Sequence, residues 1–393
     1  MSIPNYIQPT PDFSQGYIVT PDDWNNNFDG ITAFFNTQVV PAINALLAAP
    51  APNVGAQSFF NARMTASAGV PFPTADVAGT GTIYLTACSG NLIGIYDTGN
   101  SSWSNFALTS DLVLSVPAGT RDLFDVFVYN NLGSLALTTS PYHTQAVSNN
   151  PAAGANIVCN VASTTNLAIG DVISITDGSN QQEAAITALV PNTSVTLDYL
   201  KTAFTAPTIR TAVPTVAVTT VAGVPVLSSD NGKRYVCTIL VVNNQVWDTK
   251  YHRGIGNAYN RIIRPLYINA PAGYSQATGD RPADDSIVLG EHRAVVITPN
   301  IHIPTPWNLR NQKLTTGTPN PVYAQLHIDG VKHLTFGYTQ VTSKMFCDAA
   351  GVFFKFGRHI MQEWFNNASG GAVPINALVG GGETAATVGH CLN

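Results

Sequence analysis

The chain has 393 residues and a formal net charge of −5, and 10% of its residues are charged, against about 25% in an ordinary soluble domain. Positions 1–200 contain no lysine and only two arginines, Arg63 and Arg121. Because catalysis uses convergent titratable groups with perturbed pKa values, this composition predicts a durable surface or fibre-like protein and not an enzyme, with no cofactor and no metal ion.

Other features of the sequence exclude further classes of protein. The basic residues from Lys201 onward are dispersed, with no lysine or arginine run of the kind that binds nucleic acid. The apolar stretch 211–227 is interrupted by Pro214 and Pro225, so no membrane insertion is expected. The five cysteines are scattered without a Cys-x-x-Cys pair, which argues against both a disulfide framework and a zinc site.

The N-terminal region is predicted to form an extended arm followed by one short helix. Prolines punctuate residues 3–19 and disfavour helix in the residues that precede them. Thr20 is a suitable N-cap, and Pro21 suits the first helical position. An apolar stripe then recurs at helical spacing, formed by Trp24, Phe28, Ile31 and Phe35. This helix either packs on its own chain or bundles with copies of itself in an oligomer.

From residue 55 onward the pattern changes to short strands separated by turns. Apolar or alternating runs occupy residues 83–87, 91–97, 126–130 and 134–139. Residues 148–215 read as a unit of their own. Its four strand candidates are residues 156–162, 171–177, 183–190 and 194–200. Further along, Asp329-Gly330 lies between two alternating runs, which is the strongest short-range hairpin signal that a sequence offers.

Residues 345–364 fit two kinds of secondary structure. An apolar stripe at helical spacing is formed by Met345, Ala349, Val352, Phe356, Ile360 and Trp364. Gly351 and Gly357 oppose this reading, since each weakens a helix by about 1 kcal/mol. Periodicity alone favours a helix here by a small margin.

Three segments in this order resemble a β-rich module of tail-fibre and minor structural proteins of tailed bacteriophages. They are FFNARMTASAGVPFPTADVAGTGTIYLTACSGNLIGIYD at 59–97, DLFDVFVYNNLGSLALTT at 122–139 and GNAYNRIIRPLYI at 256–268. The last segment carries the most specific motif, which consists of Asn257, Ala258, Tyr259, Asn260, Arg261, Arg264, Pro265 and Leu266. The resemblance covers most of residues 55–393 in patches and contains no catalytic signature. It also changes the expectation for residues 357–364 (GRHIMQEW) from helix to strand.

The residues and the resemblance together imply a mainly β fold of several small antiparallel sandwich or barrel-like domains. We expect an arm and helix for attachment to the virion in residues 1–53. The first part of a β domain follows in residues 54–147, and residues 148–215 form an inserted small β domain. The second part of the β domain and a C-terminal β region occupy residues 216–393.

The function implied by the resemblance is that of a virion component, assembled in the host cytoplasm. The leading hypothesis is a homotrimeric tail fibre whose N-terminus attaches to tail, neck or capsid proteins and whose β domains contact a host-surface glycan or protein. One alternative is a head-attached fibre or decoration protein. Another is a tailspike depolymerase, which would require a repetitive solenoid and a pair of carboxylates.

Several polar groups have side chains suited to catalysis or metal binding, but their positions in the sequence argue against such a role. Neighbouring carboxylates on one loop, or histidines on opposite faces of a hairpin, do not converge on a ligand. The groups are Asp284-Asp285, then His327 with Asp329 and His333, and finally His390-Cys391, whose adjacency we interpret as incidental. With a two-residue turn at Asp329-Gly330, His327 would lie opposite Lys332 and His333 opposite Leu326, so the two histidines would fall on opposite faces of the hairpin. The arginines of the most specific motif suit anion or glycan contact, but we favour a structural role in locking strand corners.

Overall fold

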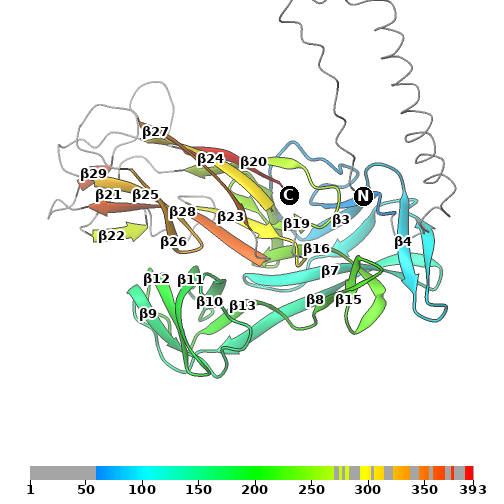
Figure 1. Ribbon diagram of the computed structural model, residues 1–393, viewed down its shortest axis with the longest axis horizontal. Coiled ribbons are helices and arrows are strands. Elements are labelled where there is room, and N and C mark those ends of the chain that lie inside the picture. Colours follow the sequence, from blue (N-terminus) through cyan, green and yellow to red (C-terminus); the bar gives the residue numbers. More distant parts are fainter. Residues whose placement is uncertain are drawn as a thin grey trace, which may run out of the picture. The chain divides into compact units, whose positions relative to one another are not determined.

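The computed structural model describes residues 59–269, 274–276, 279–282, 293–301, 305–313, 322–336, 345–353, 357–367, 373–375 and 386–392 (Figure 1). These residues form strands and turns and contain no helix, so the predicted mainly β fold is confirmed. Accordingly, no helix in this part of the chain has the length and hydropathy needed to cross a membrane. The predicted arm and helix, with Trp24, Phe28, Ile31 and Phe35, lie outside the described residues.

Thirty strands follow one another along the described residues. The first group is β1 (Ala62–Thr65), β2 (Val77–Thr80), β3 (Thr82–Ala87), β4 (Leu92–Asp97), β5 (Ser102–Ala107), β6 (Leu112–Ser115), β7 (Asp122–Asn131) and β8 (Ser134–Ala146). The second is β9 (Gly154–Asn160), β10 (Val172–Thr176), β11 (Gln181–Val190), β12 (Ser194–Leu200) and β13 (Thr208–Pro214). The third is β14 (Val218–Val221), β15 (Val224–Leu227), β16 (Asp230–Val242), β17 (Gln245–Thr249), β18 (His252–Arg253), β19 (Ile255–Asn257) and β20 (Ile263–Asn269). The last is β21 (Tyr274–Gln276), β22 (Gly279–Pro282), β23 (Arg293–Thr298), β24 (Thr305–Lys313), β25 (Val322–Ile328), β26 (Val331–Phe336), β27 (Met345–Phe353), β28 (Gly357–Asn367), β29 (Val373–Ile375) and β30 (Ala386–Leu392).

The long strands β7, β8 and β16 lie side by side and form the central layer of the fold (Figure 1). Strand β7 pairs antiparallel with both of the others, and its residues 123–128 are buried on both faces. A strand covered on both sides reads as a continuous apolar run, as VFVY does in β7.

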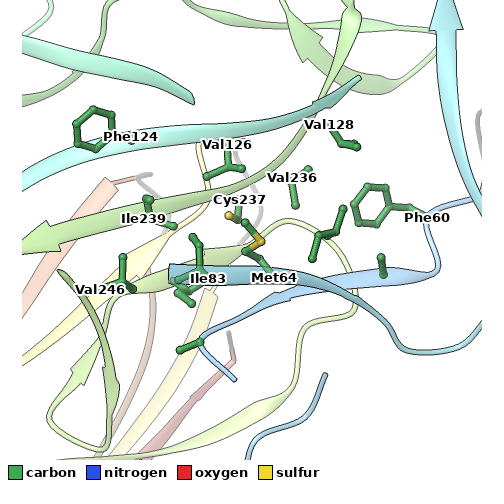
Figure 2. Packing of buried hydrophobic residues seen from close by; sticks show 14 of the residues in the cluster. Phe60, Met64, Ile83, Phe124, Val126, Val128, Val236, Cys237, Ile239 and Val246 are labelled. Atoms are coloured by element: carbon green, nitrogen blue, oxygen red, sulfur yellow. The ribbon is translucent and has the colours of Figure 1, made fainter. Parts of the chain in front are cut away.

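One face of this layer packs on the sheet β1–β3–β6 and encloses the first core (Figure 2). Phe124, Val126 and Val128 project from alternate positions of β7 toward Met64 and Ile83. Strand β16 contributes Val236, Cys237, Ile239 and Val241 to the same core. Val236 and Cys237 share this face because the pairing with β7 skips one residue between Tyr235 and Cys237, which is a β-bulge.

Residues 143–214 contain a small closed ring of strands. The antiparallel pairings run β9–β12–β11–β10–β13–β8, and the bridge between Val147 and Val161 joins the two ends of this series. Its interior is a separate apolar cluster that includes Cys159, Ile173, Leu197 and Ile209. All four predicted strands of this unit are present, and β13 is a fifth.

Buried ion pairs tie this ring to the rest of the chain. Arg121, just before β7, pairs with Glu183 of β11, and Asp122 pairs with Arg210 of β13. The β25–β26 turn also packs closely on the ring. A Cβ atom added to Gly330 would lie 2.4 Å from the Cβ of Ala185. The ring thus has its own core but contacts its neighbours through charged groups, a tight turn and a small apolar cluster of Val172, Ala185 and Ile360.

Several hairpins use two-residue turns in which both residues have positive φ, as the right-handed twist of the strands favours. The predicted turn at Asp329-Gly330 is confirmed, with φ values of +51° and +74°. His327 pairs with Lys332 as predicted. The prediction that His333 would face Leu326 is wrong, because a bulge shifts the register and places Leu334 opposite Leu326.

The C-terminal segment that fitted both helix and strand is extended. Strands β27 and β28 occupy it, and β28 pairs with β22, β23 and β25. Gly357 begins β28 with a φ of +103°, a conformation that an L residue in a helix does not adopt. The helical spacing of the apolar residues is therefore incidental here, and the strand expectation from the resemblance is confirmed.

The closed ring is predicted to be removable without loss of the remaining fold. The N–H group of Val147 donates to the carbonyl of Pro207 at 2.8 Å, so the ends of residues 148–206 already meet. Replacing this segment with a short Gly/Ser linker keeps β13 paired with β8 and should leave one cooperative unfolding transition, at reduced stability because Arg121 loses Glu183. Calorimetry of the purified variant measures this. A variant without any cooperative transition would show that the ring is part of the larger core.

Candidate functional site

The most specific motif of the sequence lies between β19 and β20 and holds the N-terminal strand β1. The side-chain amide of Asn257 bonds both backbone groups of Met64, accepting from its N–H at 3.0 Å and donating to its carbonyl at 3.2 Å. The amide of Asn260 donates to the carbonyls of Phe60 and Ala62 at 2.9 and 2.8 Å. Two asparagines thus act as an additional strand partner for a segment about 200 positions earlier in the chain.

Tyr259 belongs to a cluster of three aromatic rings around the buried Arg234. Its ring stacks on Phe60, with centroids 4.2 Å apart. The guanidinium of Arg234 lies 4.9 Å from both of these ring centroids and 5.7 Å from that of Trp103. It also donates to the carbonyls of Phe59 and Gly94 at 3.0 and 2.9 Å. Burial lowers the pKa of Arg234, although the residue remains a cation at neutral pH.

Arg264 belongs to a second buried group, in which one carboxylate forms ion pairs with two guanidinium groups. Asp248 accepts from Arg253 at 3.0 Å and pairs with Arg264 at 3.2 Å. Arg253 also donates to the carbonyl of Pro265, at 3.1 and 2.6 Å from its two nitrogens. All three charged side chains are at most 6% exposed. Burial is also the main reason why the pKa of nearby Arg63 is lowered to about 10.

The geometry of these two groups favours the structural interpretation of the motif. Asn257, Tyr259, Asn260, Arg264 and Pro265 all contact other parts of the fold, while Arg261 is half-buried. The partners Arg234, Asp248 and Arg253 were missed by the sequence analysis. One available signal was the scarcity of charged residues, since the few arginines of such a chain are candidates for buried structural roles.

One arrangement resembles a catalytic triad in its connectivity. The hydroxyl of Thr298 lies 3.2 Å from Nε2 of His359, and Nδ1 of that ring lies 2.6 Å from the carboxylate of Asp329. Thr298 is only 1% exposed, however, and its hydroxyl also lies within hydrogen-bond distance of the carbonyl of Gly357, at 3.3 Å. The ring of Phe353 stacks on the imidazole at a centroid distance of 4.0 Å. A nucleophile must reach its substrate, so this arrangement holds β23, β28 and the β25–β26 turn together.

The histidines near the β25–β26 turn do not join this arrangement. His327 is buried, whereas His333 is exposed and lies edge-on to Trp307, with centroids 5.5 Å apart. Among the described residues, no three or more His, Cys, Asp or Glu groups are placed to hold a metal ion. At the C-terminal strand, His390 and Cys391 pair with Pro265 and Arg264 in the β20–β30 ladder. Asp284 and Asp285 lie outside the described residues.

A further buried polar network centres on Asp125 of β7. Its carboxylate accepts from the hydroxyls of Tyr142 and Thr238 at 2.9 and 2.7 Å and from the amide of Asn300 at 2.7 Å. Burial raises the pKa of Asp125 to about 6, because three hydrogen bonds compensate only partly for the loss of water. A carboxyl group with this pKa suits acid–base catalysis, but complete burial keeps it away from any substrate.

The raised pKa of Asp125 predicts a pH dependence of stability. Between pH 3.8 and 6 the folded protein retains a proton that the unfolded chain has released, so stability falls as the pH rises through this window. Asp125→Asn removes this contribution. The original protein should therefore lose about 2 kcal/mol of unfolding free energy between pH 4 and pH 7 that the variant does not lose. The difference, variant minus original protein, rises by this amount. Urea unfolding at several pH values measures the difference, and a constant difference would contradict the assigned pKa.

Comparison with known proteins identifies no family. No protein-family model matches the sequence, and no curated protein matches it. Among solved structures, the chain is similar to the insecticidal delta-endotoxin Cry8Ea1 from Bacillus thuringiensis, with 7% identity and a TM-score of 0.22 over 85% of this chain and 52% of the toxin. The chain thus spans about half the length of the toxin.

A second similar structure is VP2 in the subviral particle of infectious bursal disease virus. The identity is 12% and the TM-score 0.22, over 71% of this chain and 73% of VP2. TM-scores this low do not establish a shared overall fold. No function is inferred from the toxin or from VP2.

Proposed function

We propose that this chain is a non-enzymatic structural component of a tailed-bacteriophage virion, and specifically a tail fibre. The proposal rests on one observation: the residues of the most specific phage-like motif bond to other parts of the same chain. Asn257 and Asn260 hold strand β1, and Arg264 is committed to the buried Asp248. A motif shared by proteins with different targets is expected to serve architecture, and these contacts support that role.

The arrangement of the titratable groups supports a protein without catalysis. Thr298 and His359 are buried, and the ring of Phe353 stacks on His359. Asp125 is fully buried. The tailspike alternative predicts that the protein releases reducing ends from host capsule or lipopolysaccharide. We expect no release when purified protein is incubated with these polysaccharides, and measurable release would favour the depolymerase.

Attachment and assembly are assigned to the N-terminal region. Residues 1–53 would dock onto tail, neck or capsid proteins, and the apolar stripe of the predicted helix would bundle in a homotrimer. Burying each of the four stripe side chains contributes about 1.5–3 kcal/mol before entropy losses. Phe28→Asp should therefore reduce the trimer strongly, whereas Asn26→Asp on the opposite face should not. Mass photometry decides this, and a stable 41.6 kDa monomer at micromolar concentration would contradict an intrinsic trimer.

The position of the protein on the particle tests the proposal as a whole. Antibodies raised against the purified protein are applied to intact virions, and the gold label is located by electron microscopy. Label at the tail supports a tail fibre. Label on the head instead supports the alternative of a head-attached fibre or decoration protein, and particles without label would contradict a virion component.

A further inference from the structure

A shallow hollow of about 250 Å³ lies where the β4–β5 hairpin meets the end of β7 and the start of β16. Three half-buried aromatic residues line it, namely Tyr96, Phe106 and Tyr129. Two carboxylates, from Asp97 and Asp230, line it as well. Aromatic surface combined with a few polar groups is the usual composition of a small-ligand site.

The two carboxylates are held in place by neighbouring donors. Asp97 accepts from the side-chain amide of Asn100 at 2.6 Å and from the N–H of Gly99 at 2.9 Å, and these bonds lower its pKa. Asp230 accepts from the N–H of Gly232 at 3.0 Å and pairs with Lys233 at 3.2 Å. Both carboxylates are thus available to accept hydrogen bonds from a ligand at fixed positions.

The hollow also offers hydrogen-bonding groups that the described part of the chain does not use. The hydroxyls of Tyr96 and Tyr129 and the side-chain N–H₂ of Asn130 have no hydrogen-bond partner among the described residues. Lys233 adds an ammonium group 5.8 Å above the ring of Tyr129. Both donors and acceptors therefore lie near the apolar ring surface.

We propose that this hollow binds one neutral hexopyranose ring of a cell-surface polysaccharide. Such a ring presents an apolar C–H face to aromatic side chains, while its hydroxyls both donate and accept hydrogen bonds. The volume fits, since a cavity of roughly 150 Å³ holds benzene and a hydroxylated ring needs more room. Asp97 disfavours anionic sugars by like-charge repulsion, whereas the charge of Asp230 is offset by Lys233. The natural source of the ring, a host surface, rests on the proposed function.

The proposal is tested with the intact protein and four monosaccharides. Saturation-transfer NMR and titration calorimetry are carried out with D-glucose, D-galactose and D-mannose, and with D-glucuronate as the anionic comparator. We expect at least one neutral hexose to bind with a Kd of about 1 mM and glucuronate to bind at least about tenfold more weakly. No binding of any neutral hexose, or equal binding of glucuronate, overturns the proposal.

Matched variants locate the binding in the hollow. Tyr129→Ala and Asp230→Asn should each weaken hexose binding by about tenfold. Two variants outside the hollow serve as controls. Tyr84→Ala removes another half-buried tyrosine, and Asp111→Asn changes another carboxylate that accepts a backbone N–H. Neither control should alter binding. Equal losses in test and control variants would place the sugar elsewhere and overturn the proposal. Because binding is measured on isolated protein, its failure leaves the virion labelling experiment unaffected.

Discussion

Asp248→Asn is expected to lower the free energy of unfolding by about 4 kcal/mol, because it removes a carboxylate that neutralises two buried guanidinium groups. Arg253 and Arg264 are 0% and 4% exposed, so neither can turn to water without opening the fold. The asparagine keeps the size of the side chain and one acceptor, so the loss reports charge and not packing. Urea unfolding monitored by tryptophan fluorescence measures the change.

Two further variants separate this effect from a general sensitivity to lost carboxylates. Asp230→Asn removes an ion pair with Lys233 whose side chains are 43% and 30% exposed, and it should cost less than about 1 kcal/mol. Adding Arg264→Met to Asp248→Asn removes one of the two stranded charges and should restore part of the stability. Equal losses in Asp230→Asn and Asp248→Asn would contradict a special role for the buried group.

Arg234→Ala should have a comparable effect, with a loss of about 4 kcal/mol. The substitution removes hydrogen bonds to the carbonyls of Phe59 and Gly94 and leaves a cavity beside the stacked rings of Phe60 and Tyr259. The strand β1 and the β4–β5 hairpin then lose a shared contact with β16. Thermal unfolding by circular dichroism measures the loss.

Arg234→Lys distinguishes the geometry of this site from its charge. Lysine keeps the positive charge, but its ammonium group lacks the planar fork of the guanidinium and stacks less well on the aromatic rings. We expect it to recover less than half of the stability lost in Arg234→Ala. Lys233→Ala, a change at the neighbouring position with a partly exposed side chain, is the matched control. Full recovery by lysine would mean that charge alone matters here.

The local elements of this fold were predictable because they depend on neighbouring residues. Strands such as β3 and β10 follow from short apolar runs, and the turn at Asp329-Gly330 follows from the φ values that these residues tolerate. Periodicity failed at β28, where spacing that suits a helix coincides with a strand that pairs with several partners. Pairing with distant strands decided that segment, and a local pattern does not contain this information.

The polar contacts of the candidate site were not predictable, for a related reason. The amide of Asn260 reaches Phe60 and Ala62, and the guanidinium of Arg234 reaches Phe59, across 175 to 200 sequence positions. Nothing in the residues flanking an asparagine or arginine indicates which distant carbonyl it will meet. The resemblance identified the segment as important, but only the three-dimensional arrangement shows which groups it holds.

The burial of Arg63 and Arg121 also affects how the native protein meets proteases. Between Phe59 and Leu200 the sequence contains no lysine and no other arginine. The two arginines are 3% and 1% exposed. Trypsin-like enzymes select lysine or arginine through a charged pocket and need an accessible side chain at the cleavage site. The folded segment from Phe59 to Leu200 therefore offers such enzymes no exposed cleavage site.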